Sequence, residues 1–459
     1  MSDLSLIVKA YDVRGTVPDQ LDETVAEALG TAFAETVGGD RVVVARDMRE
    51  SGVGLVAAFV RGVTATGTSV VDAGLGSTDL LYFASGSLDL PGVMFTASHN
   101  PARYNGLKMC RAGARPIGQD SGLLEIRNRA QAILDGAAPS PAQKRGDVQQ
   151  RDLLSDYAAH LRTLVDLSGI RPLKVVVDAG NGMAGYTVPE VLGSAGSIGG
   201  LPLTVVPLYF ELDGSFPNHE ANPLEPANLV DLQAAVREHG ADLGLAFDGD
   251  ADRCFVVDER GVAVSPSAIT ALVAARELAK HPGSTIIHNV ITSRAVPEII
   301  TEHGGAPVRT RVGHSFIKEE MARTGAVFGG EHSAHYYFRD FWFADTGMLA
   351  AMHTLAALGE QAAPLSELAA EYERYVASGE INSTVDDQAA RIADVEKAFA
   401  SRDGVTLDHL DGLTLGFADG SWANLRPSNT EPLLRLNVEA PTPAGMAELR
   451  DEILEIVRA

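Results

Sequence analysis

The stretch Val93-Met94-Phe95-Thr96-Ala97-Ser98-His99-Asn100-Pro101 joins an apolar run to a hydroxyl, an imidazole, an amide and a proline. The apolar run predicts a buried strand, and the residues after it predict a stiff turn at the strand end. A serine reacts only when a base removes its proton or when it already carries a transferable group. No G-x-S-x-G elbow occurs in the chain, which argues against an ordinary serine hydrolase. We expect Ser98 to be the reacting residue, and a turn serine bonded to its own backbone is the alternative.

Length and composition describe a multidomain globular protein with an acidic surface. A chain of 459 residues is too long for one core and predicts three or four domains. With 37 basic and 61 acidic side chains the net charge is −24, which repels nucleic acid and anionic membranes. We therefore expect no nucleic-acid or membrane partner, and an anionic substrate needs a local basic site.

The sequence also bears on location and redox chemistry. The first residues show no basic leader with an apolar core, and no apolar run reaches membrane-spanning length. These features predict a cytoplasmic protein. The two cysteines, Cys110 and Cys254, form no C-x-x-C pair, so we expect neither a disulfide framework nor a zinc site.

Helical and strand patterns alternate along the first part of the chain, as in α/β proteins. Residues 21–37 and 54–66 predict helices, and residues 41–45 predict a strand between them. The segment 136–144 is small, contains proline and lacks apolar periodicity, which predicts a linker after the first domain.

Two basic residues outside the Ser98 stretch, Arg14 and Lys108, are further candidates for the site. Arg14 stands beside Gly15 at the end of a short strand-like segment, where a guanidinium can be aimed at an oxyanion. Lys108 lies on a predicted strand that returns toward the Ser98 turn, and it is a candidate proton carrier if it is partly desolvated. Exposure to solvent is the alternative for both side chains.

Residues Gly180–Gly185 match the dinucleotide fingerprint G-x-G-x-x-G after a predicted strand. The helix that follows contains Pro189, and no acidic residue lies at a strand end about 20 positions later. We therefore interpret these glycines as residues that permit a tight turn at a domain hinge, and not as a dinucleotide-binding site.

Three aspartates, Asp248, Asp250 and Asp252, alternate with small residues between two buried strands. Such carboxylates can converge on one hard cation such as Mg²⁺. A calcium EF-hand is an alternative, but Arg253 stands where that loop requires glycine and the flanks predict strands. A solvated acidic turn is the other alternative, and the buried flanks argue against it.

Polar residues follow a predicted strand at 326–330. Glu331, Ser333 and His335 alternate, which in an extended segment puts them on one side and suits recognition of neighbouring sugar hydroxyls. A metal site with His332 and His335 is the alternative, but it lacks the i, i+4 helical spacing of zinc proteases.

Near the C-terminus, Arg426-Pro427-Ser428-Asn429-Thr430-Glu431-Pro432 offers a guanidinium and several neutral donors in one turn. These groups can hold a phosphate dianion without a glycine-rich loop. The ATP-binding pattern G-x-x-x-x-G-K-[ST] is absent, so any phosphate bound here belongs to another ligand.

Four motifs stand in order: TASHNP at 96–101, DGDADR at 248–253, GEHSAH at 330–335 and RPSNTEP at 426–432. Together they resemble the α-D-phosphohexomutase superfamily, phosphomannomutase/phosphoglucomutase type, over essentially the whole chain. The resemblance implies three mixed-sheet α/β domains and a smaller C-terminal α+β domain around a central active-site cleft. We expect domain limits of 1–150, 151–257, 258–372 and 373–459, with one motif in each domain.

The resemblance also assigns residues. It implies that Ser98 is a phosphoserine and that an oxygen of this group joins Asp248, Asp250 and Asp252 as a ligand of Mg²⁺. Residues matched to the transfer step are Tyr11, Arg14, His99, Lys108 and Arg253, of which Lys108 and Arg14 are proton-transfer candidates. Residues matched to the sugar and to the phosphate that is not transferred are His314, Glu331, Ser333, His335, Arg426, Ser428, Asn429 and Thr430.

The implied activity is a phosphomannomutase that also acts on glucose phosphates, through a hexose 1,6-bisphosphate (glucose or mannose) that reorients and also serves as activator. The implied partner is a hexose phosphate, and the implied assembly is a monomer or homodimer. The sugar motif GEHSAH departs from GEMSGH of dual-specificity members and from GEQSGH of phosphoglucosamine mutases, so His332 and Ala334 leave the preferred sugar open. Phosphoglucosamine mutase, a phosphatase and a non-catalytic sugar-phosphate sensor are the alternatives.

Overall fold

The computed structural model describes residues 3–9, 11–138, 142–193, 199–428 and 433–459, and for residues 314–315 the backbone alone. The chain divides into two compact units. Unit 1 contains residues 1–264 and 335–366, and unit 2 contains residues 265–334 and 367–459. No helix in the described ranges combines the length and apolarity needed to cross a bilayer.

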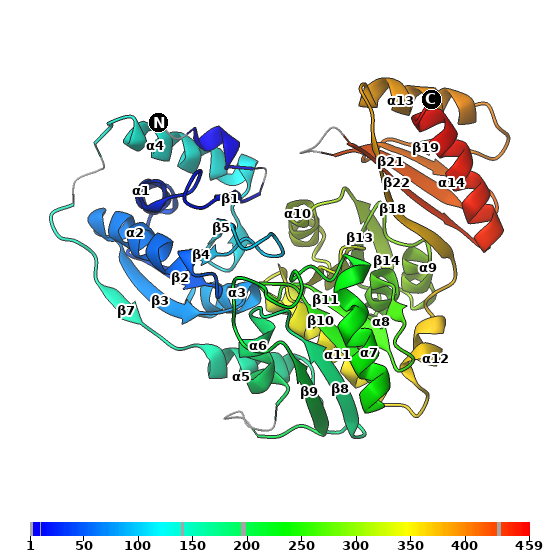
Figure 1. The fold of residues 1–459 in the computed structure, drawn as a ribbon, viewed down its shortest axis with the longest axis horizontal. Coiled ribbons are helices and arrows are strands. Elements are labelled where there is room, and N and C mark those ends of the chain that lie inside the picture. Colours follow the sequence, from blue (N-terminus) through cyan, green and yellow to red (C-terminus); the bar gives the residue numbers. More distant parts are fainter. Residues whose placement is uncertain (1–2, 10, 139–141, 194–198, 429–432) are drawn as a thin grey trace. The chain divides into compact units, whose positions relative to one another are not determined.

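Unit 1 begins with a seven-stranded mixed sheet in the order β1-β5-β4-β2-β3-β7, with β6 paired to β5 (Figure 1). Its strands are β1 (Val13–Thr16), β2 (Arg41–Arg46), β3 (Ser69–Leu75), β4 (Gly92–Phe95), β5 (Tyr104–Arg111), β6 (Arg115–Pro116) and β7 (Val148–Gln150). Its helices are α1 (Glu23–Val37), α2 (Ser51–Ala65), α3 (Thr78–Leu88) and α4 (Leu123–Leu134).

The β4–β5 pair of this sheet positions the first motif. All four residues of β4 are buried, as expected for a central strand covered on both faces. β5 runs antiparallel to it, with Met94 opposite Lys108 and Phe95 opposite Leu107. This register brings Lys108 beside the strand that leads directly to Ser98.

The second sheet of unit 1 has the order β12-β11-β10-β8-β9 and is also mixed. Its strands are β8 (Leu173–Asp178), β9 (Leu203–Leu208), β10 (Leu243–Phe247), β11 (Cys254–Asp258) and β12 (Ala263–Val264), with helices α5 (Leu154–Leu164), α6 (Ala184–Val191) and α7 (Val230–His239). β10 and β11 are buried along their whole length, and Phe247 pairs with Cys254. The segment 248–253 is therefore the tight connection between two core strands.

Unit 1 also contains the antiparallel pair β16 (Tyr336–Phe338) and β17 (Ala344–Asp345) and the buried helix α11 (Gly347–Gly359). Helix α12 (Leu365–Ala370) lies at the point where the chain passes from unit 1 to unit 2. Cys110 and Cys254 are both buried.

Unit 2 has a parallel set of strands in the order β14-β13-β15 and a five-stranded antiparallel sheet in the order β18-β22-β21-β20-β19. The first part contains α8 (Pro266–Lys280), β13 (Thr285–Asn289), α9 (Ala295–Glu302), β14 (Ala306–Thr310), α10 (His314–Thr324) and β15 (Phe328–Gly330). The second contains β18 (Val376–Thr384), α13 (Gln388–Phe399), β19 (Thr406–Asp408), β20 (Leu413–Gly416), β21 (Trp422–Pro427), β22 (Leu433–Ala440) and α14 (Pro443–Val457). Helices α13 and α14 cover one face of the antiparallel sheet, where Phe399 and Ile453 join its core (Figure 1).

Candidate active site

Ser98 lies directly on the aspartate loop of the neighbouring sheet. Its hydroxyl donates to Asp248 Oδ2 at 2.8 Å, although 150 positions separate the two residues in sequence. Ser98 has a left-handed backbone with φ 50°, and its N–H donates to Thr96 Oγ1 at 2.8 Å. Such a backbone is costly for a residue with a side chain, so the surrounding contacts must hold it. The stiff turn expected after β4 is present.

Arg49 supplies many of the contacts that hold the Ser98 turn. This residue was not singled out from the sequence. Its side chain is 1% exposed and pairs with Asp47. Its guanidinium donates to the backbone carbonyls of Ser98, Asn100, Pro101 and Tyr104 at 2.6 to 3.0 Å. One buried cation therefore fixes the whole Ser98 turn. Two charged residues directly after the buried strand β2 were the signal in the sequence.

The aspartate loop packs against Ser98 so closely that glycine is required at position 249. A Cβ there would lie 2.5 Å from the Ser98 carbonyl oxygen. Behind the loop, Met183 N–H donates to Gly249 O at 2.9 Å, and a Cβ on Gly182 would lie 2.7 Å from the same oxygen. The glycine-rich segment 180–185 forms a tight turn, with φ 51° at Gly180. This tight turn allows the backbone at Gly182 and Met183 to lie close to the aspartate loop.

Asp248, Asp250 and Asp252 converge as their alternation predicted. They are buried, and oxygen atoms from all three lie within 4.8 Å of one another. Asp250 Oδ1 and Asp252 Oδ1 are buried and have no hydrogen-bond partner. Leaving a buried carboxylate oxygen unpaired is expensive, and a hard divalent cation accepts such oxygens as ligands. The three side chains therefore fit a divalent metal ion.

Cationic side chains partly neutralise these carboxylates. Lys108 Nζ lies 2.7 Å from Asp250 Oδ2 and also contacts Asp252. Burial opposes its charge, but the carboxylates of Asp250, Asp252 and Asp345 outweigh burial and raise the pKa of Lys108. Lys108 is therefore held as an ammonium.

The pKa values of two aspartates move in opposite directions. Burial raises the pKa of Asp248 to about 7, against the attraction of Arg253. For Asp250, burial acts in the same direction, but Lys108 and the Thr78 hydroxyl outweigh it and lower the pKa. Thr78 begins helix α3, where its hydroxyl and its N–H donate to Asp250 Oδ2 and O at 2.6 and 2.9 Å. Thr78 lies in none of the four motifs and was not singled out from the sequence.

Arg253 connects the aspartate loop to His99. Its Nε and Nη2 donate to Asp248 Oδ2 at 2.9 and 2.8 Å, and Nη2 also lies 2.6 Å from His99 Nδ1. Burial and the nearby guanidinium groups of Arg253 and Arg14 lower the pKa of His99 well below its ordinary range. His99 is a neutral ring whose Nδ1 lies 3.2 Å from Ser98 Oγ and also accepts from Arg253, so the guanidinium competes with the Ser98 hydroxyl for this nitrogen.

Arg14 contacts the Ser98 turn from β1. Its Nη1 donates to Asn100 Oδ1 at 2.5 Å, and its Nη2 pairs with Asp12 at 2.6 Å. Tyr11 lies in the bend just before β1. The structure thus brings Arg14 to the turn that carries Ser98.

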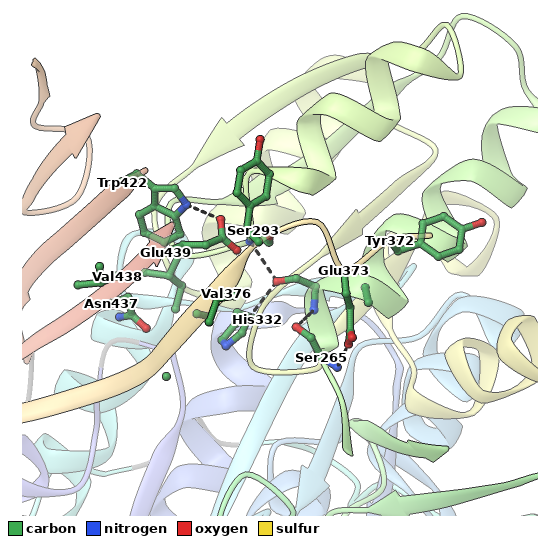
Figure 2. Close-up of a pocket in the computed structure, with 16 residues that line it drawn as sticks. Ser265, Ser293, His332, Tyr372, Glu373, Val376, Trp422, Asn437, Val438 and Glu439 are labelled. Carbon is green, nitrogen blue, oxygen red and sulfur yellow. Dashed lines mark hydrogen bonds between the residues drawn. The ribbon is translucent and has the colours of Figure 1, made fainter. Parts of the chain in front are cut away.

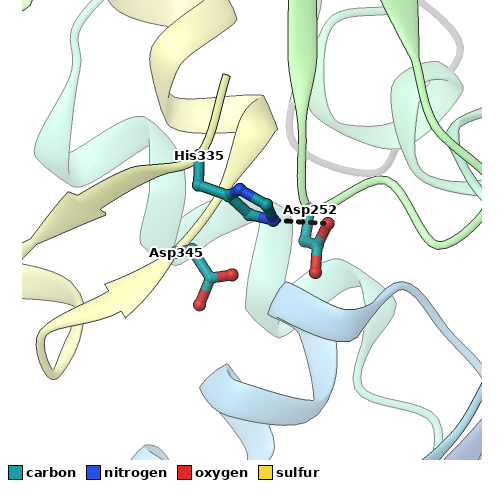
Figure 3. A group of neighbouring side chains, drawn as sticks. All are labelled: Asp252, His335 and Asp345. Carbon is teal, nitrogen blue, oxygen red and sulfur yellow. Dashed lines mark ion pairs between the residues drawn. The ribbon is translucent and has the colours of Figure 1, made fainter. Parts of the chain in front are cut away.

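His335 belongs to unit 1 and lies beside the aspartates (Figure 3). Its Nε2 is 3.9 Å from Asp252 Oδ1, and it forms an isolated bridge with Arg253. Asp345 of β17 completes a second group of potential metal ligands with Asp252 and His335. Asp345 was not singled out from the sequence because it lies in none of the four motifs.

Glu331 and Ser333 belong to unit 2, and the segment around them is not extended as predicted. Residues 331–334 form a turn, in which Ala334 N–H donates to Glu331 O at 3.1 Å and Ala334 has φ 63°. The period-two alternation therefore does not apply. Glu331 is 2% exposed and accepts from Asn289 Nδ2 at 3.0 Å and from Gly313 N–H at 3.2 Å.

Arg426 lies at the end of β21 in unit 2 and pairs with Glu380 at 2.7 Å. Arg435 stands opposite it on β22 and lies 3.4 Å from the same carboxylate. The Nε atoms of both arginines are buried without a hydrogen-bond partner. Two guanidinium groups with spare donors form an anion-binding surface. Arg435 was not singled out from the sequence, although it follows the RPSNTEP motif closely.

The remaining predicted residues are only partly described. Ser428 N–H donates to Leu433 O at 2.8 Å, which closes the connection between β21 and β22. Asn429 and Thr430 lie outside the described residues, as does the side chain of His314.

Four family models match consecutive parts of the chain. They describe the α/β/α domains I, II and III and the C-terminal domain of phosphoglucomutase/phosphomannomutase, over residues 5–135, 155–261, 265–375 and 380–456. The chain belongs to the phosphoglucomutase/phosphomannomutase family. The predicted fold class is confirmed, with three α/β domains and a smaller C-terminal domain.

Relatives within the phosphoglucomutase/phosphomannomutase family cover the full chain. A phosphomannomutase of Salmonella montevideo is 40% identical over 98% of both chains, and the phosphohexose mutases protein of Xanthomonas campestris is 41% identical over the same shares. A crystal structure of a family protein from Burkholderia thailandensis is 34% identical, with a TM-score of 0.89 over 100% of this chain and 98% of that one. The chain is accordingly a mutase, an enzyme of the isomerase class.

Proposed function

We propose that this enzyme is a phosphomannomutase that interconverts mannose 6-phosphate and mannose 1-phosphate, with glucose 6-phosphate and glucose 1-phosphate as a second substrate pair. Curated relatives named phosphomannomutase, 39 to 40% identical over 97 to 98% of the chain, support this choice. The observation that carries it is the hydroxyl of Ser98 on Asp248, beside two buried carboxylate oxygens without partners.

The proposed chemistry transfers one phosphoryl group in each direction. A free hydroxyl of the hexose monophosphate attacks phosphorus, the bond to Ser98 Oγ breaks, and the proton of that hydroxyl replaces the phosphoryl group on Ser98 Oγ. The product is a hexose 1,6-bisphosphate, which reorients and returns its other phosphate to Ser98. Lys108 and Arg14 are the proposed residues for this proton transfer. Arg14 and Arg253 supply positive charge where the transferred group is negative.

Asp248, Asp250, Asp252 and an oxygen on Ser98 are the proposed ligands of Mg²⁺, and the orphaned oxygens of Asp250 and Asp252 support this assignment. A bound Mg²⁺ neutralises charge on the phosphoryl oxygens and makes the serine oxygen a better leaving group. Phosphorylated Ser98 would add about −1.5 to −2 charges beside these aspartates, so the carboxylates also need that cation to remain together.

Unit 2 supplies the proposed groups for binding. Glu331 and Ser333 read sugar hydroxyls, with His314 of the same unit and His335 of unit 1 as further members of the predicted set. Arg426, Ser428, Asn429 and Thr430 hold the phosphate that is not transferred. We add Arg435, because it shares Glu380 with Arg426 and has an unpaired Nε. The domain limits at 150, 257 and 372, the cytoplasmic location and the monomer or homodimer remain predictions.

The test combines mass spectrometry with a sugar panel. We expect glucose 1,6-bisphosphate to place one phosphate on Ser98 and mannose 1-phosphate to be turned over faster than glucose 1-phosphate and glucosamine 1-phosphate. Ser98→Ala should lose both the phosphate and the turnover, whereas the exposed Ser121→Ala should keep both. Near-normal turnover by the Ser98 variant would refute the mechanism. Preference for glucosamine phosphate would instead identify a phosphoglucosamine mutase, and net release of phosphate would identify a phosphatase.

A further inference from the structure

His332 lies in the turn of residues 331–334, yet its contacts point to helix α8. Its Nδ1 is 3.0 Å from the hydroxyl of Ser267 in the first turn of α8. That hydroxyl also accepts from the N–H of Ser293 at 3.1 Å. Ser267, at the centre of this small network, is 2% exposed. Hydrogen bonds in such surroundings are costly to break.

The short segment after β13 contacts both Glu331 and Ser267, the partner of His332. Asn289 at its start donates to Glu331 at 3.0 Å, and Ser293 at its end donates to Ser267. The segment is itself fixed, because Thr292 Oγ1 donates to Asn289 Oδ1 at 2.7 Å. Glu331 and its neighbour His332 are therefore braced against one rigid support.

The ring of His332 borders a cavity. The residue lines a cavity of about 290 Å³ together with Val376, Trp422 and Asn437 (Figure 2). Empty space offers no atoms against which a ring can rest. The bond to Ser267 is thus the specific contact that fixes the ring at this point.

We propose that His332 is a positioning residue, whose bond to Ser267 fixes the 331–334 turn and thereby sets the preference among hexose phosphates. The inference rests on the proposed function, in which Glu331 reads the sugar. A carboxylate held in one orientation discriminates between sugars that differ at a single hydroxyl, because the wrong sugar leaves it unpaired. If the 331–334 turn can change its conformation, Glu331 can adapt to either of two such sugars.

Two variants that remove the bond test the proposal. For His332→Leu and Ser267→Ala we measure kcat/KM with mannose 1-phosphate, glucose 1-phosphate and glucosamine 1-phosphate. The ratio between the best and the second-best sugar should fall about tenfold, as expected for loss of one buried hydrogen bond. At saturating glucose 1,6-bisphosphate the final extent of Ser98 phosphorylation should be unchanged, because Ser98 and the aspartates that surround it belong to unit 1 and keep their contacts. The double variant should show no further loss, since both changes remove the same bond.

Two further variants separate positioning from general damage. His332→Asn presents a donor and an acceptor near the position of Nδ1 and should restore most of the ratio. Ser265→Ala removes a cap one residue before Pro266, where Ser265 accepts from Ser267 N–H at 3.3 Å, and should leave the ratio unchanged. An unchanged ratio in both Ser267→Ala and His332→Leu would overturn the inference, as would failure of the asparagine to restore it. If the unmodified enzyme turned over none of the three sugars, the proposed function itself would fail.

Discussion

Two charged regions of this enzyme mirror each other. In unit 1, the carboxylates of Asp250 and Asp252 share the ammonium of Lys108. In unit 2, the guanidinium groups of Arg426 and Arg435 share the carboxylate of Glu380. Each region retains atoms without partners, carboxylate oxygens in the first and Nε donors in the second. The first region is therefore suited to a cation and the second to an anion.

The two regions differ in burial. The side chains of Asp250 and Asp252 are 0% and 1% exposed, whereas Glu380 and Arg435 are each 30% exposed and only Arg426 of the basic region is as little as 10% exposed. Buried charges interact strongly and are costly to separate, whereas exposed ion pairs contribute little. A buried acidic group suits a resident metal ion, and a partly exposed basic group suits a substrate that binds and leaves at each turnover.

The largest effect is expected from breaking the basic region. Arg426→Ala removes a buried guanidinium and should weaken hexose phosphate binding by about 2 to 4 kcal/mol. This loss corresponds to an increase in KM of about 30- to 700-fold. Steady-state kinetics with mannose 1-phosphate measures it, and Arg402→Ala, which removes an exposed arginine paired with Glu452, is the control. An unchanged KM would exclude Arg426 from substrate binding.

Removing the ammonium of Lys108 should strengthen the binding of a metal ion by the acidic region. Lys108→Met deletes the ammonium that competes for Asp250, so the affinity for Mg²⁺ should rise by about tenfold or more. Calorimetric titration of the enzyme without substrate measures this affinity independently of turnover, which should fall. Lys174→Met, at an exposed lysine of β8, should change neither quantity. Weaker Mg²⁺ binding would show that Lys108 organises the carboxylates for the metal instead of competing with it.

The acidic region should also respond to pH. The pKa of Asp248 is raised to about 7 by burial, so its carboxyl holds a proton below that pH. A proton competes with a metal ion for the same oxygen, so Mg²⁺ affinity should fall by about tenfold for each unit below pH 7 and level off above it. Titrations between pH 5 and 8 test this. A flat profile would mean that Asp248 is ionised throughout.

The smallest effect is expected from the internal anion. Glu380→Gln removes the carboxylate that competes with substrate for Arg426 and should lower KM by about threefold, because the pair is partly exposed. Glu302→Gln, which affects an exposed carboxylate paired with Arg374, is the matched control. A higher KM would indicate that Glu380 positions Arg426.

Much of this site could be predicted from the sequence because its residues directly follow strands. Ser98 follows β4, the three aspartates connect β10 and β11, and the loop with Glu331 follows β15. Buried strands are visible as apolar runs, and polar residues at their ends stand out. The extended conformation predicted for residues 331–334 was wrong, because the hydrogen bond that closes this turn leaves no pattern in the sequence.

The sequence by itself determined which residues are the candidates for the chemistry, since the four motifs and their flanking strands are local features. The tertiary structure decided how these residues are held. Arg49 contacts carbonyl groups about 50 positions away, and Lys108 meets Asp250 across 142 positions. Such contacts arise only when separate elements pack together, and burial then gives them their strength and shifts their pKa values. Local patterns cannot specify which distant groups become partners. That pairing leaves carboxylate oxygens without partners in one region and guanidinium donors without partners in the other.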